Sequence, residues 1–449
     1  MEKVDAVREQ ALKILIKVLE DKAYSNILIK NLGQKFSVLD RSFITEIVYG
    51  TLKWRLKIDN AIAQLSKVRQ DKISVPIINI LRLGIYQIEF MDKVPPSAAV
   101  DECVKLAKKY SNIGAAKYVN AILRNYIRNH DDITYPKKEE NIIKFLSVFY
   151  SYPEWLVEKL VQELGPLFTE EFLKASNSVP ALTVRVNNLK TDKKSLIKKL
   201  SQSGIEASDS QYISDALILK NVPGIESMEE YRKGYFSVQD ESSMLAALIL
   251  SPKPGEFVMD VCSAPGTKST YIAELMENKG TILSGDVSIN KLKLVDENAK
   301  RLGINIIRTI NSDASKTKSE YLGKADRLLI DAPCSGFGLM RKKPEIRWNR
   351  ALDDIQEIEA LQEAILNASS KYLKIGGIMV YSTCTVLREE NLDMVHRFLN
   401  NNRNFIMEDI TDLIPDKLRK ENCRNGYLEL YPNVHGIDGF FISRLKRVK

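Results

Sequence analysis

The chain has 449 residues, which is too long for one hydrophobic core and predicts two to four domains. Its hydrophobic fraction of 44% and mean hydropathy of −0.20 are typical of a globular chain, and no apolar run approaches the roughly 18 residues that cross a bilayer. The first segment also has no signal-peptide core, so we expect a cytoplasmic protein with no membrane partner. The net charge is +8 and is unevenly distributed.

The cysteines and histidines exclude two further classes of protein. Five cysteines, an odd and widely scattered set, argue against a disulfide scaffold and against paired zinc ligands. Only three histidines occur, which leaves few ligands for a metal. We therefore expect no metal site, and we interpret the three histidines, Cys103 and Cys423 as structural.

The first third of the chain has the apolar periodicity of helices. Apolar residues recur every three or four positions from Val4 to Val18. The same pattern returns in four later stretches, at 44–56, 77–90, 98–110 and 118–128. Paired prolines at 95 and 96 end one helix, and Ser97 is expected to cap the next. We predict an all-α domain over residues 1–135.

This helical domain also carries most of the positive charge. Residues 1–140 contain 24 lysines and arginines against 17 acidic residues. An excess of this kind is typical of a surface that binds nucleic acid, because basic side chains release counterions from phosphates. A solvated helical surface would have the same composition, so charge alone leaves both interpretations open.

The middle of the chain, residues 141–235, mixes both kinds of element. Helical patterns at 151–164 and 192–204 flank a strand pattern at 181–188. We predict a small α/β connector domain here, preceded by a linker at 130–140. The sequence does not indicate what the connector does.

Residues 236–449 alternate strands with helices. Five apolar strand patterns are each followed by a helical or loop segment, at 257–264, 281–287, 306–313, 325–332 and 376–383. Alternation of this kind predicts a mostly parallel sheet with crossover helices. The last segment, 427–446, reads as two strands around a glycine-containing turn. We therefore predict a Rossmann-like α/β domain with an antiparallel hairpin at its end.

One segment, DVCSAPGTKST at 260–270, predicts a ligand-binding turn between a strand and a helix. Backbone N–H groups at the start of the helix face the crevice at the sheet edge, where they bind carboxylates or phosphates. The glycine patterns of a P-loop or of a dinucleotide fingerprint are absent. Asp286 and Asp313 end the next two strands. They are either helix caps or acceptors for a nucleoside-bearing ligand.

Two cysteines follow neighbouring strand patterns. Cys334 stands in DAPCSG and Cys384 in YSTCT, each just beyond an apolar run. Carboxyl ends of parallel strands meet at one edge, so we expect both sulfur atoms to face one crevice. A free cysteine is usually a small buried hydrophobe. A pair at one sheet edge instead favours nucleophilic chemistry, such as addition of a thiolate to carbon 6 of a pyrimidine.

At this point the chain resembles a known family. DVCSAPGTKST, SGDVS, NSDAS, DAPCSGFG, RKKPEIRW and YSTCT resemble the successive motifs of the RNA 5-methylcytosine methyltransferases. The segments SFITEIVYGTLKWR, VPPSAAVDECVKLAK and VNAILRNYIR are similar to the NusB-like RNA-binding domain of one bacterial branch. Nearly the whole chain takes part in the resemblance. The resemblance implies an enzyme that methylates a specific cytosine of small-subunit (16S) ribosomal RNA. This RNA is then the implied partner, and S-adenosyl-L-methionine is the implied cofactor.

The resemblance also implies a role for each motif residue. Cys384 is the implied nucleophile, Cys334 aids release of the methylated RNA, and Asp331 hydrogen-bonds the cytosine and lies close to the cofactor. The implied cofactor residues are Cys262, Ser263, Ala264, Pro265, Gly266, Thr267, Lys268, Asp286, Asp313 and Asp331. Ser263 and Thr267 depart from the alanine and the glycine that are common in the family. Thr267 bears on how closely the backbone approaches the ligand.

Other interpretations stay open. The enzyme could methylate transfer RNA by the same chemistry, or the chain could be a catalytically silent RNA-binding assembly factor. Binding alone requires no thiolate, so the two cysteines argue against a silent factor. Trp348 either stacks on a base or anchors its own loop, and the basic run 341–343 suits a phosphate backbone or a solvated loop. We expect the protein to be a monomer.

Overall fold

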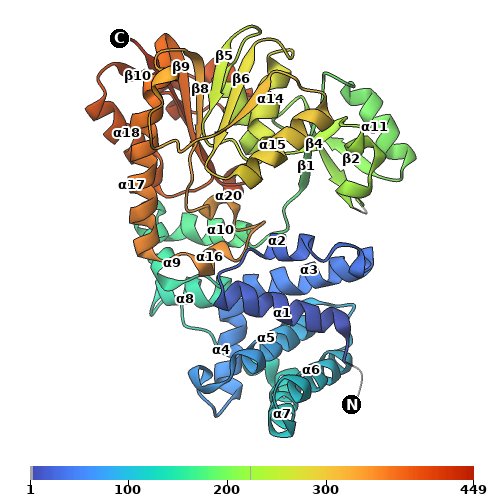
Figure 1. Cartoon of the computed structure of the whole chain (residues 1–449). Helices are drawn as coiled ribbons and strands as arrows, with labels where there is room; N and C mark the ends of the chain where they lie inside the picture. The colour runs from blue at the N-terminus through green and yellow to red at the C-terminus, as the bar shows by residue number, and fades with distance from the viewer. Residues whose placement is uncertain (1–3, 223) are drawn as a thin grey trace. The chain divides into compact units, whose positions relative to one another are not determined.

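The chain folds into two compact units (Figure 1). The structure, a computed structural model, describes residues 4–222 and 224–449. One unit runs to Ser178 and also includes Met340–Ala351. The other comprises Val179–Leu339 and Leu352–Lys449. In the described residues, no helix has the length and apolarity needed to cross a bilayer.

The first unit is helical, as predicted. Its α-helices are α1 (Ala6–Glu20), α2 (Ser25–Lys30), α3 (Val38–Lys53), α4 (Arg55–Leu65), α5 (Val75–Phe90), α6 (Pro96–Tyr110), α7 (Ile113–Asn129), α8 (Ile142–Tyr150), α9 (Glu154–Leu164), α10 (Pro166–Ser176) and α16 (Ile346–Asn349). The stretch predicted as one helix at 44–56 divides at Trp54, whose backbone leaves helical geometry between α3 and α4. Ser97 lies inside α6 rather than at its cap, because the prolines at 95 and 96 already begin the helix.

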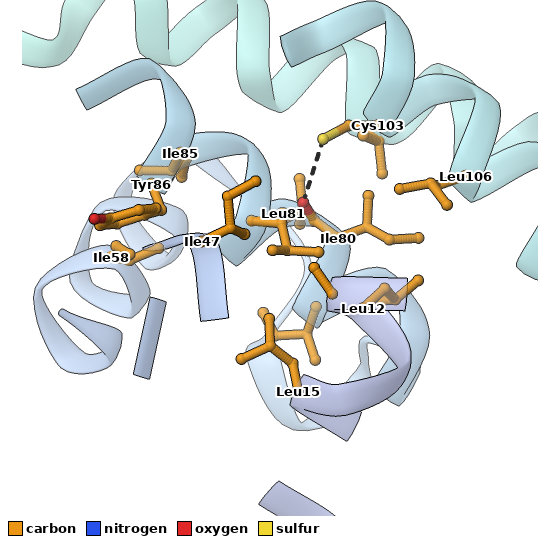
Figure 2. Close-up of a cluster of buried hydrophobic side chains, with 14 of the residues drawn as sticks. Leu12, Leu15, Ile47, Ile58, Ile80, Leu81, Ile85, Tyr86, Cys103 and Leu106 are labelled. Atoms are coloured by element: carbon orange, nitrogen blue, oxygen red, sulfur yellow. Dashed lines mark hydrogen bonds between the residues drawn. The ribbon is translucent and has the colours of Figure 1, made fainter. Parts of the chain in front are cut away.

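The core of this unit consists of the apolar stripes that the periodicity predicts. Figure 2 shows Leu12 and Leu15 of α1 near Leu81 of α5, and all three side chains are buried. Cys103 of α6 is fully buried in the same cluster, and its Sγ lies 3.6 Å from the carbonyl oxygen of Ile80. Burial raises the pKa of the Cys103 thiol to about 12, so this cysteine is an inert core residue.

The segment Met340–Ala351 is part of the helical unit although it follows the Cys334 motif in sequence. Arg347 is fully buried, stacks over the Tyr152 ring at 3.8 Å, and donates to the carbonyl oxygen of Ser151 at 3.1 Å. The Trp348 indole nitrogen donates to the carbonyl oxygen of Leu52 at 2.7 Å. Trp348 thus anchors its own segment, and Arg341 at the start of the basic run is buried rather than solvated.

The second unit contains two sheets. The smaller sheet has the antiparallel order β2-β3-β1-β4 and carries α11 (Lys193–Gln202). Its strands are β1 (Leu182–Val186), β2 (Glu206–Asp209), β3 (Ala216–Lys220) and β4 (Phe236–Val238). This part of the predicted connector is α/β, as expected, whereas α8, α9 and α10 belong to the helical unit.

The larger sheet has the order β10-β12-β9-β8-β5-β6-β7, with β11 paired to β12. The strands are β5 (Phe257–Asp260), β6 (Thr281–Asp286), β7 (Ile307–Asn311), β8 (Ala325–Asp331), β9 (Leu373–Thr383), β10 (Phe405–Met407), β11 (Tyr427–Leu430) and β12 (Phe440–Arg447). Strands β5 to β9 pair in parallel, and β10 to β12 are antiparallel. The short helix α20 (Pro432–His435) replaces part of the predicted turn between β11 and β12.

Helices cover both faces of this sheet. Successive buried residues of a strand point to opposite faces of the sheet. Leu329 packs toward α13 (Glu241–Leu250) and α14 (Thr267–Leu275). The neighbouring Leu328 packs toward α17 (Leu352–Ser369) and α18 (Leu392–Asn401). This arrangement is the doubly wound fold, whose ligands bind beyond the carboxyl ends of the parallel strands.

Candidate active site

The turn at residues 261–266 is held against the next strand. Ser263 donates from its backbone nitrogen and from its hydroxyl to the carbonyl oxygen of Gly285 on β6, at 2.9 and 3.0 Å. Gly266 has a φ of +95°, and a Cβ there would lie 3.0 Å from Val295. Only glycine satisfies both conditions, and α14 starts directly after it. The turn therefore has a single defined shape.

The connector sheet supports this turn through Arg185, which sequence reasoning missed. Arg185 of β1 is fully buried and pairs with Glu274 of α14 at 2.8 Å. Its guanidinium also donates to the carbonyl oxygen of Thr267 at 2.9 Å. An arginine inside a strand pattern is the only signal that the sequence offers for this contact.

Asp260, at the end of β5, is a buried carboxyl group. Ser269 donates to its Oδ2 at 2.6 Å, whereas Oδ1 is buried without a hydrogen-bond partner. Burial raises the pKa of Asp260 to about 7, and the neighbouring Asp331 carboxylate adds to the shift. An orphaned buried oxygen is costly unless a ligand donates to it.

Asp286 and Asp313 follow at the ends of the next two strands. Each accepts a hydrogen bond from the backbone two residues on, Asp286 from Ser288 at 2.8 Å and Asp313 from Ser315 at 3.0 Å. Hydrogen bonds from Ser315 and Lys316 lower the pKa of Asp313. Both carboxylates are thus oriented by their own turns.

Cys262 lies among all four strand-end aspartates. Burial, followed by the charges of Asp260, Asp331, Asp286 and Asp313, raises the pKa of its thiol. The charges of all four carboxylates therefore act on this thiol. Cys262 is held as an un-ionised thiol.

Asp331, at the end of β8, connects the turn with the two cysteine motifs. Its Oδ2 accepts a hydrogen bond from Lys268 of α14 at 2.7 Å, and its Oδ1 accepts one from Ser382 of β9 at 2.9 Å. Burial opposes the charge of Lys268, but the Asp331 carboxylate raises its pKa above the ordinary value. An electrostatic interaction with Cys384 raises the pKa of Lys268 further, so the Lys268 cation lies near the Cys384 sulfur atom.

The structure brings the two predicted thiols together. The sulfur atoms of Cys334 and Cys384 lie 3.1 Å apart, and the backbone nitrogen of Cys384 donates to the Cys334 sulfur at 3.3 Å. Both are free cysteines. The hydrogen bond with Cys384, followed by burial, raises the pKa of Cys334 well above its usual range. Cys334 is therefore held as a thiol.

Sequence reasoning missed three buried polar residues behind these cysteines, namely Gln362, Glu390 and Asn391. The only signal in the sequence is the polar run REEN that follows YSTCT. In the described part of the chain, no group of three or more histidine, cysteine, aspartate or glutamate side chains is arranged to hold a metal ion.

The doubly wound sheet, the strand-to-helix turn and the paired thiols are features of an RNA methyltransferase. Comparison of the sequence with protein-family models agrees with this. Residues 247–446 match the model of the 16S rRNA methyltransferases RsmB/F, and residues 5–128 match the model of the NusB family. Residues 152–226 match the model of the ferredoxin-like domain of RsmF/B-like methyltransferases. The chain belongs to the 16S rRNA methyltransferase RsmB/F family. The predicted family and the predicted fold class are confirmed.

Similar proteins cover the whole chain. It is 37% identical to a probable ribosomal RNA small subunit methyltransferase B of Bacillus subtilis (strain 168), over 99% of both chains. It is 30% identical to ribosomal RNA small subunit methyltransferase B of Escherichia coli O7:K1, also over 99% of both. The solved structure of PH0851 is 26% identical and covers 99% of this chain and 100% of its own, with a TM-score of 0.80. NSun6 from Pyrococcus horikoshii with SFG is 26% identical and covers 67% of this chain and 99% of its own, with a TM-score of 0.60.

Proposed function

We propose that this protein methylates carbon 5 of one cytosine in small-subunit ribosomal RNA, with S-adenosyl-L-methionine as the methyl donor. The observation that carries the proposal is the 3.1 Å approach of the Cys334 and Cys384 sulfur atoms beside the Asp331–Lys268 pair. Membership of the RsmB/F family and the names of the full-length relatives support the RNA substrate.

The donor fits the residues at the sheet edge. The orphaned Oδ1 of Asp260 suits an ammonium group, and the N–H groups at the start of α14 suit a carboxylate. We propose that Cys262 to Lys268, the seven residues given above, hold the methionine part. Asp286 would bind the ribose, Asp313 the adenine edge, and Asp331 would lie beside the reacting end. When bound, S-adenosyl-L-methionine supplies an electrophilic methyl group.

The two cysteines act in sequence in this proposal. The Cys384 thiolate, with Lys268 nearby, adds to carbon 6 of the cytosine, which makes carbon 5 nucleophilic. Asp331 hydrogen-bonds the amino and ring-nitrogen edge and stabilises the charge that develops there. Methyl transfer to carbon 5 would release S-adenosyl-L-homocysteine. The carbon-5 proton would then pass to solvent as the bond from carbon 6 to sulfur breaks and Cys384 leaves as a thiolate. Cys334, held as a thiol, aids this elimination.

The helical part supplies affinity for RNA in this proposal. Its match to the NusB family and its excess of basic residues support a nucleic-acid surface. We propose three functional segments: an RNA-binding domain at 1–135, a connector at 141–235 and a catalytic domain at 236–449. We further propose that the protein is a monomer that acts in the cytoplasm.

Covalent trapping tests the chemistry. Cys384→Ala should neither methylate RNA nor form an adduct, whereas Cys334→Ala should accumulate a covalent RNA adduct that survives a denaturing gel. A Cys384→Ala protein that still methylates would refute the assignment.

Bisulfite sequencing of ribosomal RNA from cells with and without the gene tests the substrate. One small-subunit cytosine should lose its methyl group when the gene is deleted. Loss from transfer RNA instead would favour the transfer-RNA alternative, and no loss in either RNA would favour a silent assembly factor.

A further inference from the structure

Three buried polar side chains lie behind the two cysteine turns and have no part in the proposed chemistry. Gln362 of α17 and Glu390 are fully buried, and Asn391, the residue before α18, is 3% exposed. Burying polar groups costs free energy unless each has partners, so their partners indicate what they are for.

Gln362 and Glu390 together hold both neighbours of Cys334. Gln362 Nε2 donates to the carbonyl oxygen of Pro333 at 2.9 Å, on one side of the cysteine. The Ser335 backbone nitrogen donates to Glu390 Oε2 at 2.8 Å, on the other side, and the Ser335 hydroxyl donates to Oε1. Gln362 also donates to Glu390 Oε2 at 3.0 Å. The peptide units that flank Cys334 are therefore fixed from behind by one connected pair.

Asn391 holds both neighbours of Cys384 in the same way. Its Oδ1 accepts a hydrogen bond from the Thr383 hydroxyl, and its Nδ2 donates to the carbonyl oxygen of Thr385 at 3.2 Å. The two supports meet where the hydroxyls of Ser335 and Thr385 lie 2.7 Å apart. This contact between the two hydroxyls fixes the distance between the turn that carries Cys334 and the turn that carries Cys384.

The charge of this cluster is not symmetric between the cysteines. Glu390 contributes to the raised pKa of Cys334, after the hydrogen bond with Cys384 and burial. Burial also raises the pKa of Glu390 itself. The Glu390 carboxyl group therefore favours the thiol form of Cys334, which can donate its proton to the departing Cys384 sulfur 3.1 Å away.

We propose that Gln362, Glu390 and Asn391 are positioning residues. Gln362 and Glu390 orient Cys334 for release of the RNA adduct. Asn391 orients Cys384 for its addition to the cytosine. This inference rests on the roles of the two cysteines in the proposed function. It assigns a separate, buried support to each thiol.

The test is a single-turnover experiment with full-length protein, excess S-adenosyl-L-methionine and end-labelled small-subunit RNA, quenched in denaturant over time. Gln362→Met, which keeps the volume but loses both hydrogen bonds, should slow adduct release about 10-fold and leave formation within about two-fold. Glu390→Gln should have the same effect, more weakly, since its amide oxygen can still accept from Ser335. Asn391→Ala should slow adduct formation about 10-fold, and Asn391→Asp, which keeps the oxygen acceptor, should recover part of the rate.

Asn187→Ala is the matched control, because Asn187 is fully buried and donates to two carbonyl oxygens away from the cysteines. It should lower thermal stability without changing the ratio of adduct formed to adduct released. If the Gln362, Glu390 and Asn391 variants change that ratio no more than this control does, the inference is overturned. Cys384→Ala and Cys334→Ala are run alongside: if they fail to block and to trap the adduct, the proposed function itself is wrong.

Discussion

The two halves of the active edge of the sheet are built differently. On the cofactor half, Asp286 and Asp313 are each oriented by the backbone two residues further along. On the thiol half, Ser335 and its partner Glu390 are 55 residues apart in the chain, and the two cysteines are 50 residues apart. These two aspartates are oriented by local turns, whereas the turn that carries Cys334 is held by a segment far away in the chain.

This difference determines which substitutions do local damage. A change on the cofactor half should alter one turn and the affinity for the donor. A change on the thiol half should propagate to the partner turn, because the supporting hydrogen bonds form one network. The following predictions test this contrast, in order of expected effect.

Replacing Asp331, where the two halves meet, should have the largest effect. Asp331→Asn removes the ion pair with the buried Lys268 and the carboxylate at the proposed cytosine site, so turnover should fall by about 10²- to 10⁴-fold. Asp326→Asn is a matched control at the other end of the same strand, where Asp326 pairs with Lys374 at 2.6 Å. Methylation rates at saturating substrates distinguish the two, and equal losses would contradict a role specific to Asp331.

Asp260 should make stability depend on pH. Its pKa is about 7 in the folded protein against the ordinary value of 3.8, so the unfolded chain ionises first as pH rises. Stability should therefore be full below about pH 4 and fall as pH rises toward 7, by up to about 4 kcal/mol. Urea unfolding of the wild type and of Asp260→Asn at pH 5 and 7.5 measures this. A stability difference between the two proteins that stays constant with pH would contradict the prediction.

Gly266→Ala tests whether the cofactor turn has only one shape. The substitution combines a φ of +95° with a Cβ 3.0 Å from Val295, so the free energy of unfolding should fall by about 2 to 4 kcal/mol. Gly376→Ala is the control, because Gly376 has a φ of +79° but no neighbour within 4 Å of an added Cβ. It should cost only about 1 kcal/mol. Equal costs would mean that the turn can move away from Val295.

Asp286→Ala should have the smallest effect and the most local one. Loss of the proposed ribose contact should raise the KM for S-adenosyl-L-methionine about 10-fold and leave the formation and release of the RNA adduct unchanged. Asp296→Ala, on the exposed face of α15 (Ile289–Leu302), is the control. If Asp286→Ala also changes the rate of adduct release, the expectation that substitutions on the cofactor half act only locally is contradicted.

The segment that follows Cys334 illustrates why charge patterns mislead. The basic run 341–343 suits a phosphate backbone or a solvated loop, yet its first residue, Arg341, is buried. Arg347 in the same segment is fully buried against Tyr152 and donates to acceptor oxygens of three distant residues. An arginine can be buried when its guanidinium finds enough acceptors. Those acceptors, on Lys53, Ser151 and Asn177, come from segments far away in the chain, so no window of sequence contains them.

The sequence by itself determined the elements and the chemistry-bearing positions. Apolar periodicity predicts the helices and strands, and turn residues predict the bend at Gly266, because both depend on neighbours within a few residues. Only the tertiary structure decided that β8 and β9 stand side by side and that Cys334 and Cys384 come within 3.1 Å. It also decided which buried groups hold them, because pairing between distant segments depends on the packing of the whole core rather than on any local pattern.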